Sequence, residues 1–110
     1  MKELTMLEEV EEFIGASDFN FLYISRTNCS VCHALLPQIK DLFETNFPLV
    51  NLGYVNTERV EEIAGQLSVF TVPVLILFLD GKELIREARF VHVEKFKENI
   101  SKVYRMIHES

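Results

Sequence analysis

The sequence has no tryptophan, only two cysteines and too few basic residues to balance its acidic ones. Its formal net charge is -6, with 11 Lys and Arg against 17 Asp and Glu. It therefore lacks the excess of positive charge that binding to nucleic acid or to an anionic membrane requires. No apolar run approaches the roughly 18 residues that cross a bilayer. We expect neither a nucleic acid nor a membrane as partner, and we expect a monomer.

Internal repeats, low-complexity tracts and linkers are also absent from the 110 residues. This length suits one domain, residues 1–110, that buries a core of its own. Hydrophobic residues make up 48% and charged residues 25%, which is the balance of an ordinary globular protein. The nine phenylalanines predict a core rich in aromatic side chains.

A secretory signal is missing as well. The first residues, MKELTMLEEVEEF, are acidic and amphipathic, whereas a signal needs a basic start, a continuous apolar stretch and a small-residue cleavage site. We therefore predict a cytoplasmic location. In that reducing compartment, two lone cysteines are more often catalytic or metal-binding than structural. Cys29 and Cys32 therefore need a chemical role.

The apolar pattern predicts alternating helices and strands. Helical spacing indicates helices at residues 5–15, from the cysteines to about 46 with a kink at Pro37, from Asn56 or Thr57 to 67, and at 93–107. Strands are predicted at residues 19–25, 48–56, 73–79 and 82–90, with a hairpin turn at Asp80–Gly81. Thr5 and Glu8 have the spacing of a capping box before the first helix.

This order of elements predicts an α/β protein. Its central mixed sheet has about four strands, with helices on both faces, and no clear strand precedes the first helix. Segment 73–79 is apolar on both faces, as a central strand covered from both sides would be. Segment 82–90 is more polar, which is typical of an edge strand.

The stretch RTNCSVCHALLP contains the two cysteines and allows three kinds of site. It can be a redox dithiol, half of a zinc site, or a c-type haem attachment with His33 as ligand. Zinc needs four ligands, and beyond Cys29 and Cys32 only three scattered histidines are available. We expect His92 and His108 to be solvated near the ends of the last helix. Haem would need attachment outside the cytoplasm and a mostly helical fold.

The redox dithiol is therefore favoured, and we expect no metal or organic cofactor. Cys29 falls where a strand ends and a helix begins, so the positive end of the helix dipole should lower its pKa below the usual value of about 8.5. Cys32 lies one helical turn further, points toward the apolar stripe and should stay protonated. Cys29 would attack a substrate disulfide, and Cys32 would resolve the mixed disulfide.

The chain as a whole resembles the thioredoxin family. TNCSVCHALLP is similar to the family's active-site loop and helix, with Pro37 at the place of its helix-kinking proline. FTVPVLILFLDGKEL is similar to the segment that holds the family's cis-proline, which would be Pro73. The resemblance implies a thioredoxin-like fold and a thiol-disulfide oxidoreductase. Its substrates would be disulfide-containing proteins or small disulfides, and its electrons would come from a reductase or a low-molecular-weight thiol.

The same resemblance implies where substrate binds. Pro73 would pack beside the sulfurs, and the backbone of Val72 would pair with an extended substrate strand. Asn28, Ser30 and Val31 would complete the substrate-binding residues around the dithiol. An ordinary trans proline at the start of an edge strand is the alternative for Pro73.

Several residues depart from the family pattern. Asn28 stands where the family usually has Trp, and Ser30 and Val31 replace Gly-Pro. Tyr23 replaces a buried Asp that helps to deprotonate the second cysteine, and Leu52 replaces its Lys partner. A phenol with a pKa near 10 is a poor base at neutral pH, so the usual proton relay is missing. Tyr23 can equally be a plain core aromatic.

Two further alternatives stay open. His33 is either an exposed helix residue or a group that tunes the pKa of a thiol. Arg89 and Phe90 lie near the active-site end of the edge strand, where they either shape a substrate groove or are ordinary surface residues. For the whole protein, the competing hypothesis is a thioredoxin-fold binding or redox-sensing module without catalysis.

Overall fold

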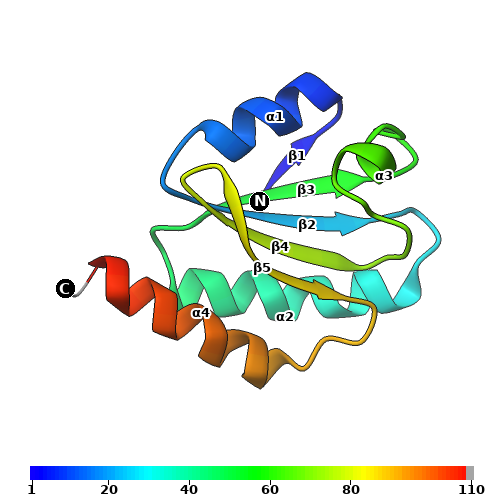
Figure 1. The fold of residues 1–110 in the computed structure, drawn as a ribbon. Helices are drawn as coiled ribbons and strands as arrows, with labels where there is room; N and C mark the ends of the chain where they lie inside the picture. The colour runs from blue at the N-terminus through cyan, green and yellow to red at the C-terminus, as the bar shows by residue number, and fades with distance from the viewer. Residues whose placement is uncertain (109–110) are drawn as a thin grey trace.

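The structure is a computed structural model that describes residues 1–108 (Figure 1). The elements follow in the order β1 (Lys2–Leu4), α1 (Leu7–Gly15), β2 (Phe19–Ser25), α2 (Ser30–Asn46), β3 (Asn51–Asn56), α3 (Ile63–Gln66), β4 (Val74–Leu79), β5 (Lys82–Ala88) and α4 (Val93–His108).

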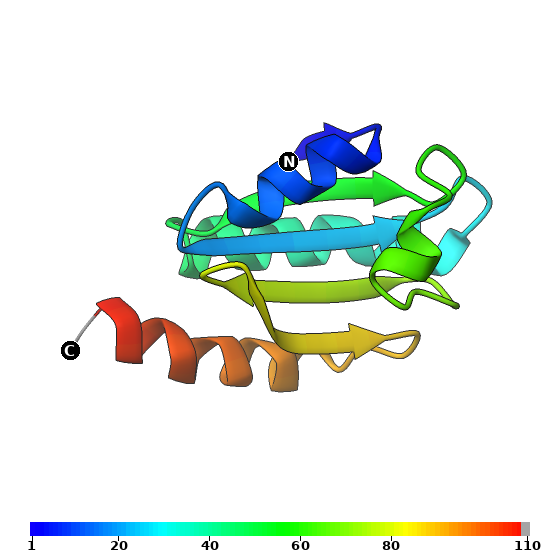
Figure 2. The ribbon, with the colours of Figure 1, turned by 45° about the horizontal axis from the view of Figure 1, so that its top comes forward.

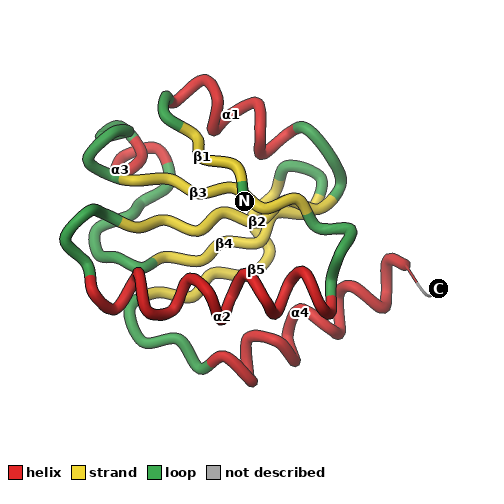
Figure 3. Tube along the Cα trace, turned by 180° about the vertical axis from the view of Figure 1, so that it is seen from behind, coloured by secondary structure: helices red, strands yellow, loops and turns green. Residues whose placement is uncertain are grey.

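The strands form one mixed sheet in the order β1-β3-β2-β4-β5. Strands β1, β3 and β2 run parallel, while β4 and β5 are antiparallel. Helices α1 and α3 cover one face of the sheet, and α2 and α4 cover the other (Figures 1, 2 and 3). The predicted α/β fold with a mixed sheet between helices is confirmed. None of the helices between residues 1 and 108 combines the length and hydropathy that a bilayer span requires.

Strand β2 lies in the middle of the sheet and is buried along its whole length. Because side chains alternate between the faces of a strand, β2 serves both halves of the core. Phe21 and Tyr23 belong to the apolar cluster under α2 and α4, and Leu22 and Ile24 belong to the cluster under α1 and α3. Such a doubly covered strand needs apolar residues on both faces.

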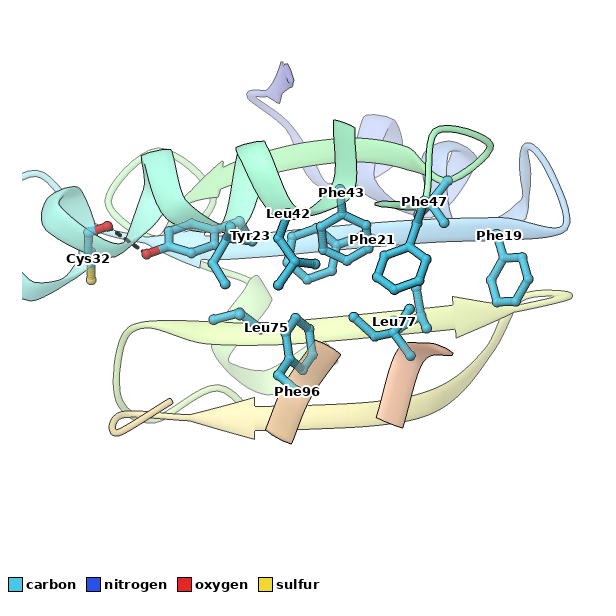
Figure 4. Close-up of a cluster of buried hydrophobic side chains, with 13 residues drawn as sticks. Phe19, Phe21, Tyr23, Cys32, Leu42, Phe43, Phe47, Leu75, Leu77 and Phe96 are labelled. Carbon is cyan, nitrogen blue, oxygen red and sulfur yellow. Dashed lines mark hydrogen bonds between the residues drawn. The ribbon is translucent and has the colours of Figure 1, made fainter. Parts of the chain in front are cut away.

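The core between the sheet and helices α2 and α4 is aromatic, as the nine phenylalanines predict (Figure 4). The ring centroids of Phe21 in β2 and Phe43 in α2 are 4.3 Å apart. Phe96 in α4 meets the ring of Phe43 edge-on at 6.2 Å. Aromatic contacts of this kind add about 0.5–1.5 kcal/mol beyond the burial of area. They fix α2 on the sheet, and thereby the cysteines at its start.

The β4-β5 hairpin turns at Asp80 and Gly81, whose φ angles are 51° and 79°. Two successive positive φ angles suit the right-handed twist of a hairpin, and Asp-Gly is a favoured sequence for them. Strand β5 forms the sheet edge as predicted, but it ends at Ala88 rather than at residue 90. The reason is Arg89, whose φ of 68° leaves the extended conformation.

The sheet has a fifth strand that the sequence did not reveal. Strand β1 pairs in parallel with β3, with Leu4 opposite Val55, so a strand does precede the first helix. It is only three residues long, and Leu4 is its one buried side chain. A segment this short has no alternation of apolar and polar residues that a sequence pattern can detect.

The predicted capping box pairs Thr5 with the wrong residue: its partner is Glu9, not Glu8. The backbone N–H and the hydroxyl of Thr5 both donate to the Glu9 carboxylate, at 2.9 and 2.8 Å. These bonds lower the pKa of Glu9. Helix α1 begins at Leu7, and Met6 is the residue that caps it.

Two other boundaries are later than predicted. Strand β3 begins after a turn in which the Val50 N–H donates to the Phe47 carbonyl. Helix α3 begins at Ile63 rather than at Asn56 or the next residue. The Asn56 side chain accepts the N–H of Glu58 at 2.9 Å, a local bond that favours a turn over a helix.

Candidate active site

The two cysteines lie at the junction between the end of β2 and the start of α2, at the right-hand end of the sheet in Figure 1. Cys29 is the residue that caps α2, and Cys32 lies in its first turn. They form a disulfide, with their Cα atoms 5.3 Å apart. Helix α2 continues past Pro37, the internal proline that the sequence pattern singles out.

The two sulfurs differ in their surroundings. Cys29 is half-buried, whereas Cys32 is fully buried in the apolar cluster under α2. The backbone N–H of Cys32 donates to Cys29 Sγ at 3.2 Å. This donor and the positive end of the helix favour negative charge on Cys29 once the disulfide is reduced. Burial disfavours a thiolate at Cys32.

We predict that alkylation of the reduced protein, followed against pH, gives one fast cysteine that titrates below 8.5. Peptide mapping should place the label on Cys29, because only this thiol is both accessible and stabilised as the thiolate. Unfolded protein in denaturant is the control, since both thiols should then react alike. Faster labelling of Cys32 would reverse the two roles.

Val72 and Pro73 precede strand β4, in a loop at the same end of the sheet as the cysteines. The peptide bond between them is cis. Pro73 is buried, and Val72 is half-buried against the same apolar cluster as Cys29. Strand β4 begins with the next residue, Val74, which pairs with Ile24 near the end of β2, just before the cysteine loop. The β2-β4 pairing thus places Val72 and Pro73 at the end of the sheet where the cysteine loop starts, and their contact with the sulfurs stays a prediction.

The remaining predicted substrate-binding residues lie at the surface around the dithiol. Asn28 and Ser30 are exposed on either side of Cys29. Val31, between the two cysteines in sequence, exposes 58% of its surface although it is apolar. These three residues are therefore accessible to a partner.

The histidines do not gather around the cysteines. His33 is exposed, and its Nε2 lies 2.8 Å from the Thr27 carbonyl in the loop before Cys29. His92 and His108 are exposed near the two ends of α4, as predicted, although the His108 ring also packs on Tyr104. Within residues 1–108, no three His, Cys, Asp or Glu side chains form a group that can hold a metal ion.

Tyr23 is a buried core aromatic that lies beside Cys32 (Figure 4). Its hydroxyl donates to the Cys32 carbonyl at 2.6 Å, and its ring stacks on Tyr54 at 6.2 Å. Burial raises the pKa of Tyr23 well above its ordinary value of 10.0, and the neighbouring Tyr54 raises it further. The phenol is therefore protonated at neutral pH. With the apolar Leu52 packed against the same cluster, neither residue provides a base for Cys32.

One exposed aromatic near the site has no signal in the sequence. Phe70 exposes 83% of its surface in the loop before β4. A single phenylalanine in a loop belongs to no helical or strand periodicity, so its exposure is visible only in the structure. Arg89 and Phe90, which the sequence places at the active-site end of β5, do lie there: the Arg89 N–H donates to the Pro73 carbonyl at 2.9 Å.

The model of the Thioredoxin family matches residues 5–103. The chain belongs to the thioredoxin family. It is 50% identical to "Thioredoxin-like protein YdfQ" of Bacillus subtilis (strain 168), with 96% of each chain covered. It is similar in structure to Fasciola hepatica thioredoxin, with a TM-score of 0.82, 24% identity, and 93% of this chain and 98% of the other covered. For thioredoxin from Trypanosoma brucei brucei, the TM-score is 0.83 at 14% identity, covering 94% and 89%.

The family and the Cys29–Cys32 disulfide together support a thiol-disulfide oxidoreductase in general. Disulfide substrates and a reductase are the partners that this family implies. Beside Cys32, this chain has the protonated phenol of Tyr23.

Proposed function

We propose that this thioredoxin-like protein reduces or exchanges disulfides in protein or small-molecule substrates. Cys29 acts as the nucleophile, and Cys32 resolves the mixed disulfide. The observation that carries the proposal is the asymmetry of the pair: one sulfur is accessible at a helix N-terminus, and its partner is buried within bonding distance.

The reaction starts from the reduced protein. The Cys29 thiolate attacks one sulfur of the substrate disulfide, a Cys29–substrate bond forms, and the other substrate sulfur leaves as a thiolate. Cys32 then loses its proton and attacks Cys29 Sγ. The Cys29–Cys32 disulfide forms, and the second substrate sulfur leaves. Two electrons have moved from the protein to the substrate, and a reductase or a low-molecular-weight thiol restores the dithiol.

The residues around the pair bind the substrate. The backbone of Val72 pairs with an extended substrate segment, and Pro73 packs beside the reacting sulfurs. Asn28, Ser30 and Val31 contact the segment from the α2 side. Their exposure, and the half-buried position of Val72 on the cluster that holds Cys29, support this arrangement. A cytoplasmic location and a monomeric state stay predictions.

Reduction of insulin disulfides by the purified protein, with dithiothreitol as electron donor, tests the proposal. We expect turbidity from the released insulin B chain well ahead of the dithiothreitol-only control. A non-catalytic binding or redox-sensing module would give no acceleration, although its cysteines would still be oxidised and reduced. No acceleration with insulin or with a small disulfide would overturn the oxidoreductase proposal.

A further inference from the structure

Three of the loops at the end of the sheet where the sulfurs lie contain no acidic residue (Figures 1 and 2). They comprise residues 26–33 before and into α2, residues 68–73 before β4, and residues 89–92 between β5 and α4; we call them the collar. The chain has 17 Asp and Glu against 11 Lys and Arg, yet the collar contains Arg26 and Arg89 and not one acidic residue. A fourth loop at the same end, residues 57–62 between β3 and α3, carries Glu58, Glu61 and Glu62 against Arg59, so the positive charge is confined to the collar itself.

The collar also carries the two large apolar side chains with the highest exposure in residues 1–108. Phe70 exposes 83% and Phe90 exposes 81% of its surface. Leaving an aromatic ring in water forgoes about 1.5–3 kcal/mol of burial, which a partner that covers the ring recovers. Neither ring contributes to the two apolar clusters of the core.

Phe70 lies on the α3 side of the dithiol. It lines an open pocket together with Arg26 and Val72, and Val69 forms part of the pocket's apolar wall. Glu61, which follows β3 and lies outside the collar, lines the same pocket. An apolar side chain of a segment that passes along Val72 can therefore enter this pocket next to the Phe70 ring.

Phe90 lies on the β5 side. The bond from the Arg89 N–H to the Pro73 carbonyl fixes this loop alongside the Val72–Pro73 pair. The Arg89 guanidinium lies over the Phe90 ring, 5.8 Å from its centroid. Arg89 is exposed and has no acidic partner among the salt bridges of residues 1–108, so its charge is available to a carboxylate.

We propose that Phe70, Arg89 and Phe90 select the polypeptide that docks at the dithiol. The preferred partner is an extended, disulfide-bonded segment with an aromatic or large aliphatic side chain near its cysteine and a carboxylate close by. This specificity rests on the proposed function, and the exchange itself is the one already described: the substrate disulfide gains two electrons as the Cys29–Cys32 disulfide forms.

The test uses four oxidised homodimers of a short peptide with one cysteine. They carry either Phe or Ser at an apolar position and either Glu or Lys at a charged position beside the cysteine. Rapid mixing, acid quenching and chromatography of the thiol products give the rate constant for reduction by the reduced protein, and each value is divided by the rate constant for hydroxyethyl disulfide. We expect about a tenfold preference for Phe over Ser and about threefold for Glu over Lys, the latter weakening at high salt.

Three variants locate the preference in the collar. Phe70→Ser and Phe90→Ser should each reduce the ratio for Phe over Ser peptides. Arg89→Glu should invert the charge preference, so that the Lys peptide becomes the better substrate. Leu49→Ser is the matched control, because Leu49 is an exposed apolar residue, 62% accessible, in the α2-β3 loop away from the collar. It should keep both preferences.

The outcomes separate the two proposals. Failure to reduce hydroxyethyl disulfide or any peptide would overturn the proposed function together with this specificity. Reduction of all four peptides at equal relative rates would overturn the specificity alone. A concentration-dependent dimer that Phe70→Ser abolishes would assign the collar to a second copy of the chain and would also overturn it.

Discussion

Replacing Cys29 by serine is expected to abolish disulfide reduction down to the uncatalysed background. A serine hydroxyl cannot form a mixed disulfide, so the first step is lost entirely. Replacing Cys32 by serine should instead stop the reaction after that first step. The variant should accumulate a stable covalent adduct with its substrate, because no sulfur is left to displace Cys29.

The two variants are compared on a non-reducing gel and by intact mass after mixing with a disulfide substrate. Cys32→Ser should give an adduct at one substrate per protein that dithiothreitol releases, and Cys29→Ser should give none. Circular dichroism provides the control for folding. An adduct formed by Cys29→Ser through Cys32 would contradict the assignment of the nucleophile, since Cys32 is fully buried in the oxidised protein.

Replacing Tyr23 by aspartate is expected to speed the second step and to weaken the fold at the same time. Cys32 must lose a proton while buried, and the protonated Tyr23 phenol cannot take it. In the natural protein, resolution should be slow at pH 7 and should rise with pH by up to about tenfold per unit, as the thiolate fraction does below the pKa of the thiol. An added general base should accelerate the step at pH 7 about a hundredfold.

The same substitution should lower the free energy of unfolding by at least about 3 kcal/mol. It removes a fully buried aromatic ring and places an acid in an apolar cluster. Urea unfolding measures this loss. Stopped-flow kinetics of mixed-disulfide resolution, recorded against pH for both forms, measures the gain in rate.

Tyr23→Phe is the matched control, because it keeps the ring and removes only the hydroxyl that donates to the Cys32 carbonyl. It should cost about 1 kcal/mol of stability and should leave the pH dependence of resolution unchanged. If the natural protein already resolves rapidly at a rate that does not depend on pH, another group supplies the base, and the role given to Tyr23 is wrong.

The sequence alone was sufficient for the general fold and for the dithiol. Strands with 4–8 alternating or wholly apolar residues and helices of several turns leave periodic patterns, and β2, β4, α2 and α4 all have them. The spacing of Cys29 and Cys32 at a strand-to-helix junction is also a local property. Local signals survive in sequence because the residues that create them are neighbours along the chain.

The errors fall where short elements depend on distant partners. Strand β1 exists because β3 offers it an edge to pair with, and no pattern in three residues records that edge. Before α1, Thr5 bonds to Glu9 rather than to Glu8. Side-chain geometry selects between these two adjacent acids, and sequence spacing does not. The late start of α3 follows from a side-chain bond of Asn56, which periodicity does not include.

At the site, the residue types came from the sequence and their surroundings came from the tertiary structure. The sequence placed Tyr23 where an acid is usual, but only the fold aims its hydroxyl at the Cys32 carbonyl and stacks its ring on Tyr54. The acid-free collar joins three loops that are far apart in the chain. Sheet pairing brings them to one end, where Phe70 and Phe90 belong to neither apolar cluster and stay exposed. Chemistry that depends on one junction can be predicted from sequence, whereas a surface assembled from several loops is decided by the packing of the whole sheet.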